Sequence, residues 1–290
     1  MDYSGDAVGM PKAVTSVERA VDYWADTKIW VSGDARTFEN LKSEGWDFRA
    51  TDDNHLAIIE SASRGGSGIF VHELLLAGVS ARNNHGCEGL AAAAEQGNVA
   101  IVAMLLNAGA PLNWPPDENN RFGCDALDRA AYGGVPQIVR MIFSHNPDVN
   151  SRNAGRSTPL LIAAETCLRK VHSRGLANTA VVLIAAGADV NSKDSDGDSA
   201  LMKCPYNAGF VRALLAVGAI DVNTADETGA TPLMNAFEPA VIEALLKAGA
   251  DPYLKDKKGH TALDMDTENP PVMRLLKRWM VTHPKKSVSP

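Results

Sequence analysis

Short apolar segments alternate with polar turns along most of the chain, and the apolar segments end in a recurring way. The clearest example runs from Val181 to Leu201, where an apolar run is followed by Gly187, a polar stretch and a second apolar segment. Gly187 suits the left-handed residue that closes a helix, because glycine has no Cβ to clash in that conformation. The aspartates and the glycine of residues 194–198 are typical of a tight turn. This stretch therefore predicts a helix, a hairpin and a second helix.

The same pattern returns at an almost constant interval. Its closing glycines are 31 or 33 residues apart, except for one interval of 78 residues. They are Gly45, Gly78, Gly109, Gly187, Gly218 and Gly249. A degenerate copy fills the wide interval, and there Asn146 replaces the glycine, since Asn is the next most tolerant residue of the left-handed conformation. A Thr-Pro-Leu landmark at 158–160 and 231–233 marks the start of the following helix.

A turn followed by two helices, repeated at about 33 residues, resembles the ankyrin-repeat family over residues 14–283. The resemblance implies an all-α solenoid of about eight stacked helix-turn-helix units with short β-hairpin fingers. The terminal caps are expected at about 14–50 and 256–283, and flexible tails at 1–13 and 284–290. The histidine that usually follows Thr-Pro-Leu in this family is absent, and Met202 and Met234 are two of its replacements. We therefore expect a less regular and less stable stack.

Two insertions and a proline interrupt the repeats. One insertion lengthens the hairpin between Trp114 and Phe122, and the other separates paired helices near residues 166–175. Pro205 follows the short apolar start of the sixth repeat, and proline lacks the N–H that a helix interior needs. The inner helix of that repeat should therefore be short or broken.

Composition narrows the function classes. A net charge of −7 argues against a general nucleic-acid binder, which needs a basic surface to displace counterions. Because the chain has no apolar run of 18 residues, no membrane span is expected. The first residues lack a secretory pattern, so we expect a cytoplasmic protein, or a periplasmic one if a leader was removed.

Four cysteines in a chain of this length do not predict a disulfide scaffold. Cys87 and Cys124 occupy matching sites in adjacent repeats, just after the turn glycine. A bridge between them is conceivable, but we do not expect one.

The resemblance places partner binding on a concave face made of hairpin tips and inner helices. The implied partner-binding residues are Glu95, Gln96, Tyr132, Glu165, Asp196, Asp198 and Glu227, together with Trp114, Asp117, Glu118, Arg121 and Phe122 on the long hairpin. The same family positions also include Ser63, Arg64, Asn84, His85, Thr166, Ser195, Lys257 and Lys258. For each single residue, the alternative is an ordinary solvated side chain.

The long hairpin is the sharpest candidate within this set. Trp114 and Phe122 flank two prolines and an acidic pair, and aromatic residues with arginine are typical interface anchors. Alternatively, Trp114 and Phe122 fold back and cover the neighbouring repeat. The sequence leaves both interpretations open.

The later hairpins are rich in aspartate. The segment 194–198 does not fit a calcium loop, because its glycine comes one place too early and no glutamate closes the loop. An acidic row that includes Asp221, Asp226, Asp251 and Asp256 would instead attract a basic protein surface.

Catalytic motifs are missing from the sequence, and the seven histidines are scattered over different repeats. We therefore expect no enzyme activity, no metal and no cofactor. The predicted function is protein binding by a chain that is monomeric beforehand, as an inhibitor of the bacterial toxin-immunity type that occludes its partner. The alternative is an intracellular adaptor, scaffold or regulatory subunit with several partners.

Overall fold

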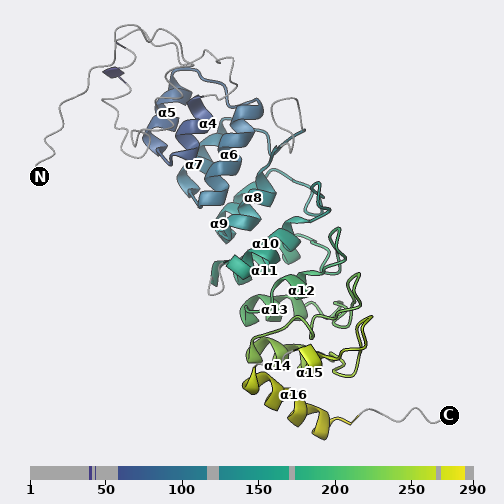
Figure 1. Cartoon of the computed structure of the whole chain (residues 1–290). Helices are drawn as coiled ribbons and strands as arrows, with labels where there is room; N and C mark the ends of the chain where they lie inside the picture. The colour runs from purple at the N-terminus through teal and green to yellow at the C-terminus, as the bar shows by residue number, and fades with distance from the viewer. Residues whose placement is uncertain are drawn as a thin grey trace, which may run out of the picture. The chain divides into compact units, whose positions relative to one another are not determined.

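The computed structural model describes residues 39–40, 43, 58–115, 124–169, 174–265 and 269–284 (Figure 1). Most of the predicted N-terminal cap, the tail at 1–13, and the tail at 284–290 apart from Pro284 lie outside these ranges. The chain divides into an N-terminal unit that ends at Ala126 and a C-terminal unit that begins at Leu127. In the described ranges, no helix is long and apolar enough to cross a membrane.

Between residues 58 and 115, the N-terminal unit contains two helix pairs, the second and third repeats. Its helices are α4 (Ile58–Arg64), α5 (Gly68–Leu76), α6 (Asn84–Gln96) and α7 (Val99–Asn107). α4 packs on α6, and α5 packs on α7, so the inner helices form one layer and the outer helices another. After α7, the strands β1 (Asn113–Trp114) and β2 (Cys124–Asp125) pair in antiparallel fashion, with Trp114 opposite Cys124.

The C-terminal unit is likewise built of inner and outer helices. Its helices are α8 (Ala126–Gly133, starting at the unit boundary), α9 (Pro136–Phe143), α10 (Pro159–Arg169), α11 (Arg174–Ala185), α12 (Ala200–Lys203), α13 (Ala208–Leu215), α14 (Pro239–Lys247), α15 (Ala262–Met265) and α16 (Pro270–Thr282). The inner helices α10 and α12 contact each other, and the outer helices α9, α11, α13, α14 and α16 pack in sequence (Figure 1). The predicted all-α solenoid of helix pairs with hairpin fingers is confirmed.

The ends of the outer helices follow from the sequence. Gly187 has a φ of +95°, and Asn146 has a φ of +56° at the corresponding place, as predicted from its replacement of the glycine. At the other end, Asn207 accepts a hydrogen bond from the backbone N–H of Phe210 (3.0 Å) and caps α13. Pro239 starts α14 at a position where the missing N–H costs nothing.

The inner layer thins out in the sixth and seventh repeats. α12 has only 4 residues and ends before Pro205, as predicted. In the seventh repeat, residues 232–234 form a turn and residue 235 a bend in place of an inner helix. There, Met202 and Met234 occupy the position of the family's histidine, and each thioether sulfur lies 3.5 Å from a backbone N–H of its own repeat, at Ser199 and Thr231. These weak contacts stay inside one repeat, so they do not join neighbours.

Asparagine side chains link successive repeats directly after the turns that close α9, α11 and α13. The Nδ2 of Asn191 donates to the carbonyl of Ala219 (2.9 Å), and its Oδ1 accepts from the backbone N–H of Asp221 (2.9 Å). The carboxylate of Asp189 accepts from the backbone N–H of Asn191 (3.0 Å) and so fixes its orientation. Two hydrogen bonds therefore join equivalent turns of neighbouring repeats.

The same device recurs on both sides of Asn191. Asn150 bonds Gly187 and Asp189 in this way, and Asn223 bonds Gly249 and Asp251. In the last repeat Tyr253 takes the asparagine position, and its hydroxyl donates to the carbonyl of Met280 (3.1 Å). In the N-terminal unit Arg82 plays this part, with its Nε donating to the carbonyl of Ala108 (3.3 Å). We call this series the asparagine ladder.

Each finger is closed by one side chain and tied to the next finger by the backbone. The carboxylate of Asp194 accepts from the backbone N–H groups of Asp196 (3.0 Å) and Asp198 (2.9 Å). Between fingers, the N–H of Ser195 donates to the carbonyl of Gly155 (3.1 Å), and the N–H of Glu227 donates to Asp196 (3.4 Å). The fingers of the C-terminal unit are therefore held in register with one another.

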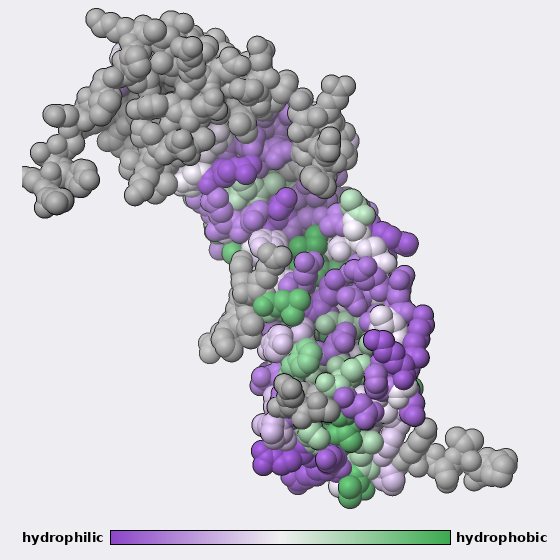
Figure 2. Space-filling model, in the orientation of Figure 1, coloured by the Kyte–Doolittle hydropathy of each residue, from purple (hydrophilic) through white to green (hydrophobic). Residues whose placement is uncertain are grey.

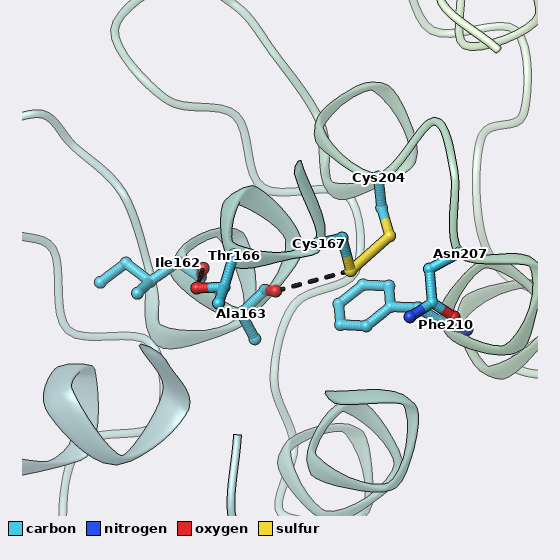
Figure 3. The surroundings of a disulfide bond; sticks show 7 residues. All are labelled: Ile162, Ala163, Thr166, Cys167, Cys204, Asn207 and Phe210. Carbon is cyan, nitrogen blue, oxygen red and sulfur yellow. Dashed lines mark hydrogen bonds between the residues drawn. A yellow bond between two sulfur atoms is a disulfide. The ribbon is translucent and has the colours of Figure 1, made fainter. Parts of the chain in front are cut away.

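A disulfide bond joins Cys167 in α10 to Cys204, the residue after α12, with a Cα–Cα distance of 5.3 Å (Figure 3). The ring of Phe210 lies beside it in Figure 3. Cys87 is also disulfide-bonded, and the side chain of Cys124, its possible partner from the sequence, lies outside the described residues. The sequence did not predict the Cys167–Cys204 bond. Cys167 lies near the end of α10 and Cys204 just after α12, and stacking of the two repeats brings these residues, 37 positions apart, into contact.

We predict that Asn191→Ala lowers the free energy of unfolding by about 2 kcal/mol, because two inter-repeat hydrogen bonds are lost at about 1 kcal/mol each. Urea denaturation followed by circular dichroism measures the change. The control is Asn178→Ala at an exposed position of α11, which should change stability by about 0.5 kcal/mol or less. Equal effects of the two substitutions would contradict a role of the ladder in joining repeats.

Candidate functional site

The fingers and inner helices of the C-terminal unit form one candidate surface, which we call the finger face. It consists of helices α10 and α12 and the fingers at 153–157, 194–198, 226–230 and 256–260. In Figure 1 these fingers project from the same side of their helices. Because the asparagine ladder and the finger hydrogen bonds fix their spacing, side chains at the tips are held at regular intervals.

A lysine lies at the centre of this face. The Nζ of Lys203 lies 2.5 Å from the carboxylate of Asp194 and 3.7 Å from that of Asp198. The side chains of Lys203 and Asp194 are 14% and 5% exposed, so this ion pair is largely removed from water. It anchors α12 to its own finger.

The local charges shift the pKa values of this group in opposite directions. Burial alone would raise the pKa of Asp194, but hydrogen bonds from Lys203 and from two backbone N–H groups outweigh it and lower that pKa. Burial raises the pKa of Asp198, to which the neighbouring carboxylates of Asp194 and Asp226 add. Burial would lower the pKa of Lys203, but its bond to Asp194 raises it. Lys203 and Asp194 are therefore a charged structural pair near neutral pH.

The outer charges of the finger face vary in sign from finger to finger. Glu165, Asp196 and Glu227 are exposed on the fifth, sixth and seventh repeats. Exposed basic residues stand on the fingers at either side, with Arg156 before them, and Lys257 and Lys258 after them. The acidic row expected from the sequence is thus an acidic centre flanked by basic tips.

The long hairpin of the N-terminal unit is described only at its base. Trp114 is partly buried and packs against Cys87 and Ala91 of α6. This packing matches the alternative in which Trp114 covers the neighbouring repeat. Asp117, Glu118, Arg121 and Phe122 lie outside the described residues, so their predicted role stays a prediction.

Other predicted residues take different places on the two units. Gln96 is exposed, and its Nε2 donates to the carbonyl of Arg64 (2.6 Å), so it joins the second and third repeats. Glu95 and Tyr132 are partly buried. Arg64 pairs with Glu60 in its own helix (2.7 Å).

Three of the family positions are buried, which corrects the expectation that they face a partner. Ser63 and Thr166 are 0% and 1% exposed, and each hydroxyl donates to the carbonyl four residues earlier in its helix. His85 is 5% exposed and lies 3.6 Å from the carboxylate of Glu60. Small polar side chains can bond back to their own helix, so polarity alone did not mark exposure.

An aromatic pair was missed by the sequence reasoning. Tyr206 and Phe237 stack with their ring centroids 5.6 Å apart, although each is about 40% exposed. They directly precede the N-caps of α13 and α14, where glycines precede the N-caps of α5 and α7. The presence of aromatic residues where other repeats have glycine was the sequence signal that could have revealed this pair. In Figure 2, patches of apolar surface interrupt the polar surface of the C-terminal unit.

Two further features of the described ranges are their metal-ligating side chains and a hollow between two outer helices. No group of three or more His, Cys, Asp or Glu residues is arranged to hold a metal ion there. A hollow between α13 and α14 is lined by small apolar residues together with Arg212, Glu243 and Lys247. Glu243 and Lys247 pair with each other on one helix face, so the hollow offers no nucleophile with a base beside it.

Comparison with known families gives two matches. A model described as ankyrin repeats (3 copies) matches residues 168–256, and another described as ankyrin repeats (many copies) matches residues 90–141. YahD of Escherichia coli, named for its ankyrin repeats, is 27% identical over 190 residues, which cover 61% of this chain and 87% of YahD. Several further curated relatives are larger, and the chain spans 5 to 42% of their length.

Many solved structures resemble the chain, among them the following two. One is a chain from the complex of the Bd0816 predatory endopeptidase of Bdellovibrio bacteriovorus with the immunity protein Bd3460. It is 33% identical, has a TM-score of 0.54, and the match covers 65% of this chain and 96% of that chain. The other is the ankyrin repeat domain of human ASB11, with 18% identity, a TM-score of 0.56, and coverage of 87% and 96%, which shows the fold. Ankyrin repeats are typically protein-binding modules.

We predict that Lys203→Met lowers the free energy of unfolding by about 3 kcal/mol at pH 6, because it leaves Asp194 buried and ionised without a partner. In the wild type, the lowered pKa of Asp194 gives stability above its unfolded pKa of about 3.9 that is lost as the pH falls through the folded value. The difference between variant and wild type should therefore shrink as the pH falls toward the lowered pKa of Asp194, below which this carboxyl group is protonated in both folded proteins.

Urea denaturation at pH 6 and pH 3.5 measures both effects. Lys247→Met is the matched control, since the pair of Lys247 with Glu243 is 65% and 52% exposed. The control should lose about 0.5 kcal/mol or less. A Lys203→Met loss that does not change with pH would show that packing of the lysine stem, rather than its charge, accounts for the effect.

Proposed function

The chain belongs to the ankyrin-repeat family, and we propose that it binds one partner protein with its finger face and inhibits that partner by occlusion. The observation that carries this proposal is the 33% identity to a chain of an endopeptidase–immunity protein complex, over 96% of that chain. We carry over the class of role, a toxin-immunity type of inhibitor, and leave the identity of the enzyme open. In this proposal, residues 14–283 act as one solenoid that is monomeric before binding.

The geometry of the finger face suits a stoichiometric inhibitor. The finger hydrogen bonds and the Lys203–Asp194 pair fix the face before any partner arrives. A pre-ordered surface loses less conformational entropy on binding than a mobile one, which favours tight binding. The face also presents side chains from several repeats, so one partner can be held across a broad surface rather than at one pocket.

The exposed charges define the kind of surface that fits. Asp196 and Glu227 stand beside each other on consecutive fingers, where the N–H of Glu227 donates to the carbonyl of Asp196. The carboxylate of Asp194 is already neutralised by Lys203, so the exposed carboxylates supply the available negative charge. We therefore expect a partner with a basic patch opposite the sixth and seventh repeats.

We predict that the double substitution Asp196→Lys/Glu227→Lys weakens partner binding by about 10- to 100-fold, mainly through slower association, because it reverses the charge at the centre of the face. The partner is first captured from the source organism with the wild-type chain, and the affinity and kinetics are then measured with purified proteins. If the captured partner is an enzyme, its activity is titrated with the wild-type chain, and inhibition should saturate at one chain per enzyme.

Glu243→Lys/Glu238→Lys is the control, since it makes the same change of charge at exposed residues of α14 and its N-cap, outside the finger face. The control should bind within about 3-fold of wild type at physiological salt. Equal weakening by both variants would move the interface off the finger face. Several weak partners without inhibition would favour an adaptor, and turnover by the chain alone would overturn the proposal entirely.

A further inference from the structure

A disulfide bond joins the fifth and sixth repeats. Cys167 lies near the end of α10 in the fifth repeat, and Cys204 directly follows α12 in the sixth repeat. Their bond closes a loop of 37 residues, which contains the whole outer helix α11 and the following finger. Cys87 of α6 is disulfide-bonded as well. In the described ranges no cysteine is free.

The bond between Cys167 and Cys204 is buried inside the stack of repeats. Both residues are 0% exposed, and the ring of Phe210 lies beside the sulfur atoms (Figure 3). Disulfide bonds form and break when a thiolate attacks a sulfur atom from outside, so the attacking group needs access. An oxidant therefore has to reach these cysteines while the fifth and sixth repeats are still open. Once the repeats have packed, a reductant meets the same barrier.

We propose that the chain folds and acts in an oxidising compartment, and that the Cys167–Cys204 bond is a permanent structural link rather than a reversible switch. The oxidant is a disulfide of a thiol oxidoreductase. One cysteine thiolate attacks that disulfide and forms a mixed disulfide, and the second cysteine displaces the oxidoreductase thiolate. The two cysteines lose two electrons and two protons, and the oxidoreductase disulfide becomes a dithiol.

The position of the bond explains why the chain needs it. α12 has 4 residues and stops before Pro205, and the seventh repeat has a turn and a bend where its inner helix would stand. The sixth repeat therefore offers α10 less helical surface than a complete repeat would. The bond ties the end of α12 to α10 where the inner helix of the sixth repeat is short. A chain kept reduced would lose this link.

This inference departs from the cytoplasmic location expected from the sequence, because reduced glutathione and thioredoxin keep most cytosolic cysteines as thiols. It also stands apart from the proposed function. The redox state of the cysteines can be measured without any partner, and an inhibitor could exist in either compartment. Failure of one proposal therefore leaves the other intact.

The first experiment reads the thiols in the source organism. Cells are quenched in acid, the chain is denatured and treated with an alkylating reagent, and peptides containing Cys167 and Cys204 are analysed by mass spectrometry. We expect both cysteines to escape alkylation and to appear as one linked peptide. Alkylation of both cysteines in most molecules would overturn the proposal, because it would show that the folded chain works with free thiols.

The second experiment separates a permanent link from a switch. Purified oxidised chain is treated with millimolar dithiothreitol, with and without urea. We expect at least a 100-fold slower reduction of the Cys167–Cys204 bond in the native protein than in urea, because both sulfur atoms are buried. Rapid reduction of the native protein would indicate a reversible switch and would contradict the proposal.

The double variant Cys167→Ser/Cys204→Ser tests the structural role. Its midpoint of thermal unfolding should fall by about 10 °C relative to the oxidised wild type. Wild-type protein that is reduced with dithiothreitol in urea and then refolded under reducing conditions should show a similar decrease. If the double variant does not fold, the refolded wild type under reducing and oxidising conditions gives the same comparison. Equal midpoints of reduced and oxidised wild type would show that the bond is dispensable.

Discussion

The hydrogen bonds of the asparagine ladder are the interaction on which the stack depends. A solenoid has no single core, so its stability rests on the contacts between neighbouring repeats. Asn191 supplies two such contacts at a turn whose backbone is already fixed by a left-handed glycine. Each asparagine therefore sets the distance and the rotation of the next turn. The finger positions follow from that geometry, because each finger directly follows a ladder turn.

The ladder also explains how the repeats stay in register where the inner helices are short or missing. The sixth and seventh repeats lose inner-helix residues at Pro205 and in the turn and bend at 232–235, yet Asn191 and Asn223 keep the outer turns in register. Three further contacts support these two repeats: the Cys167–Cys204 bond, the stacked aromatic rings of Tyr206 and Phe237, and the Lys203–Asp194 pair. Each replaces helix packing with a contact between particular side chains.

The sequence predicted the fold because glycine spacing reports backbone conformation directly. Asn146 could be placed in a left-handed turn from its position alone, and its φ of +56° agrees. Side-chain contacts between repeats could not be predicted in this way. The Cys167–Cys204 bond depends on the relative position of α10 and α12 along the stack. The burial of Thr166 depends on which side of α10 this residue occupies. Predicting such contacts requires the register of neighbouring helices, and the repeat period of the sequence does not give it.

The candidate site was also only partly predictable from the sequence. The exposure of Asp196 and Glu227 at the finger tips agrees with the family positions, whereas the role of Lys203 could not be predicted, since no sequence rule pairs an inner-helix lysine with an aspartate nine residues earlier. That pairing matters for function because it divides the carboxylates into two groups. Asp194 is bound to its own repeat and holds the finger in place, while the exposed carboxylates remain available to a partner. The exposed carboxylates can therefore determine which partner binds without affecting the stability of the fold. For this reason, proteins that share the fold can bind different partners.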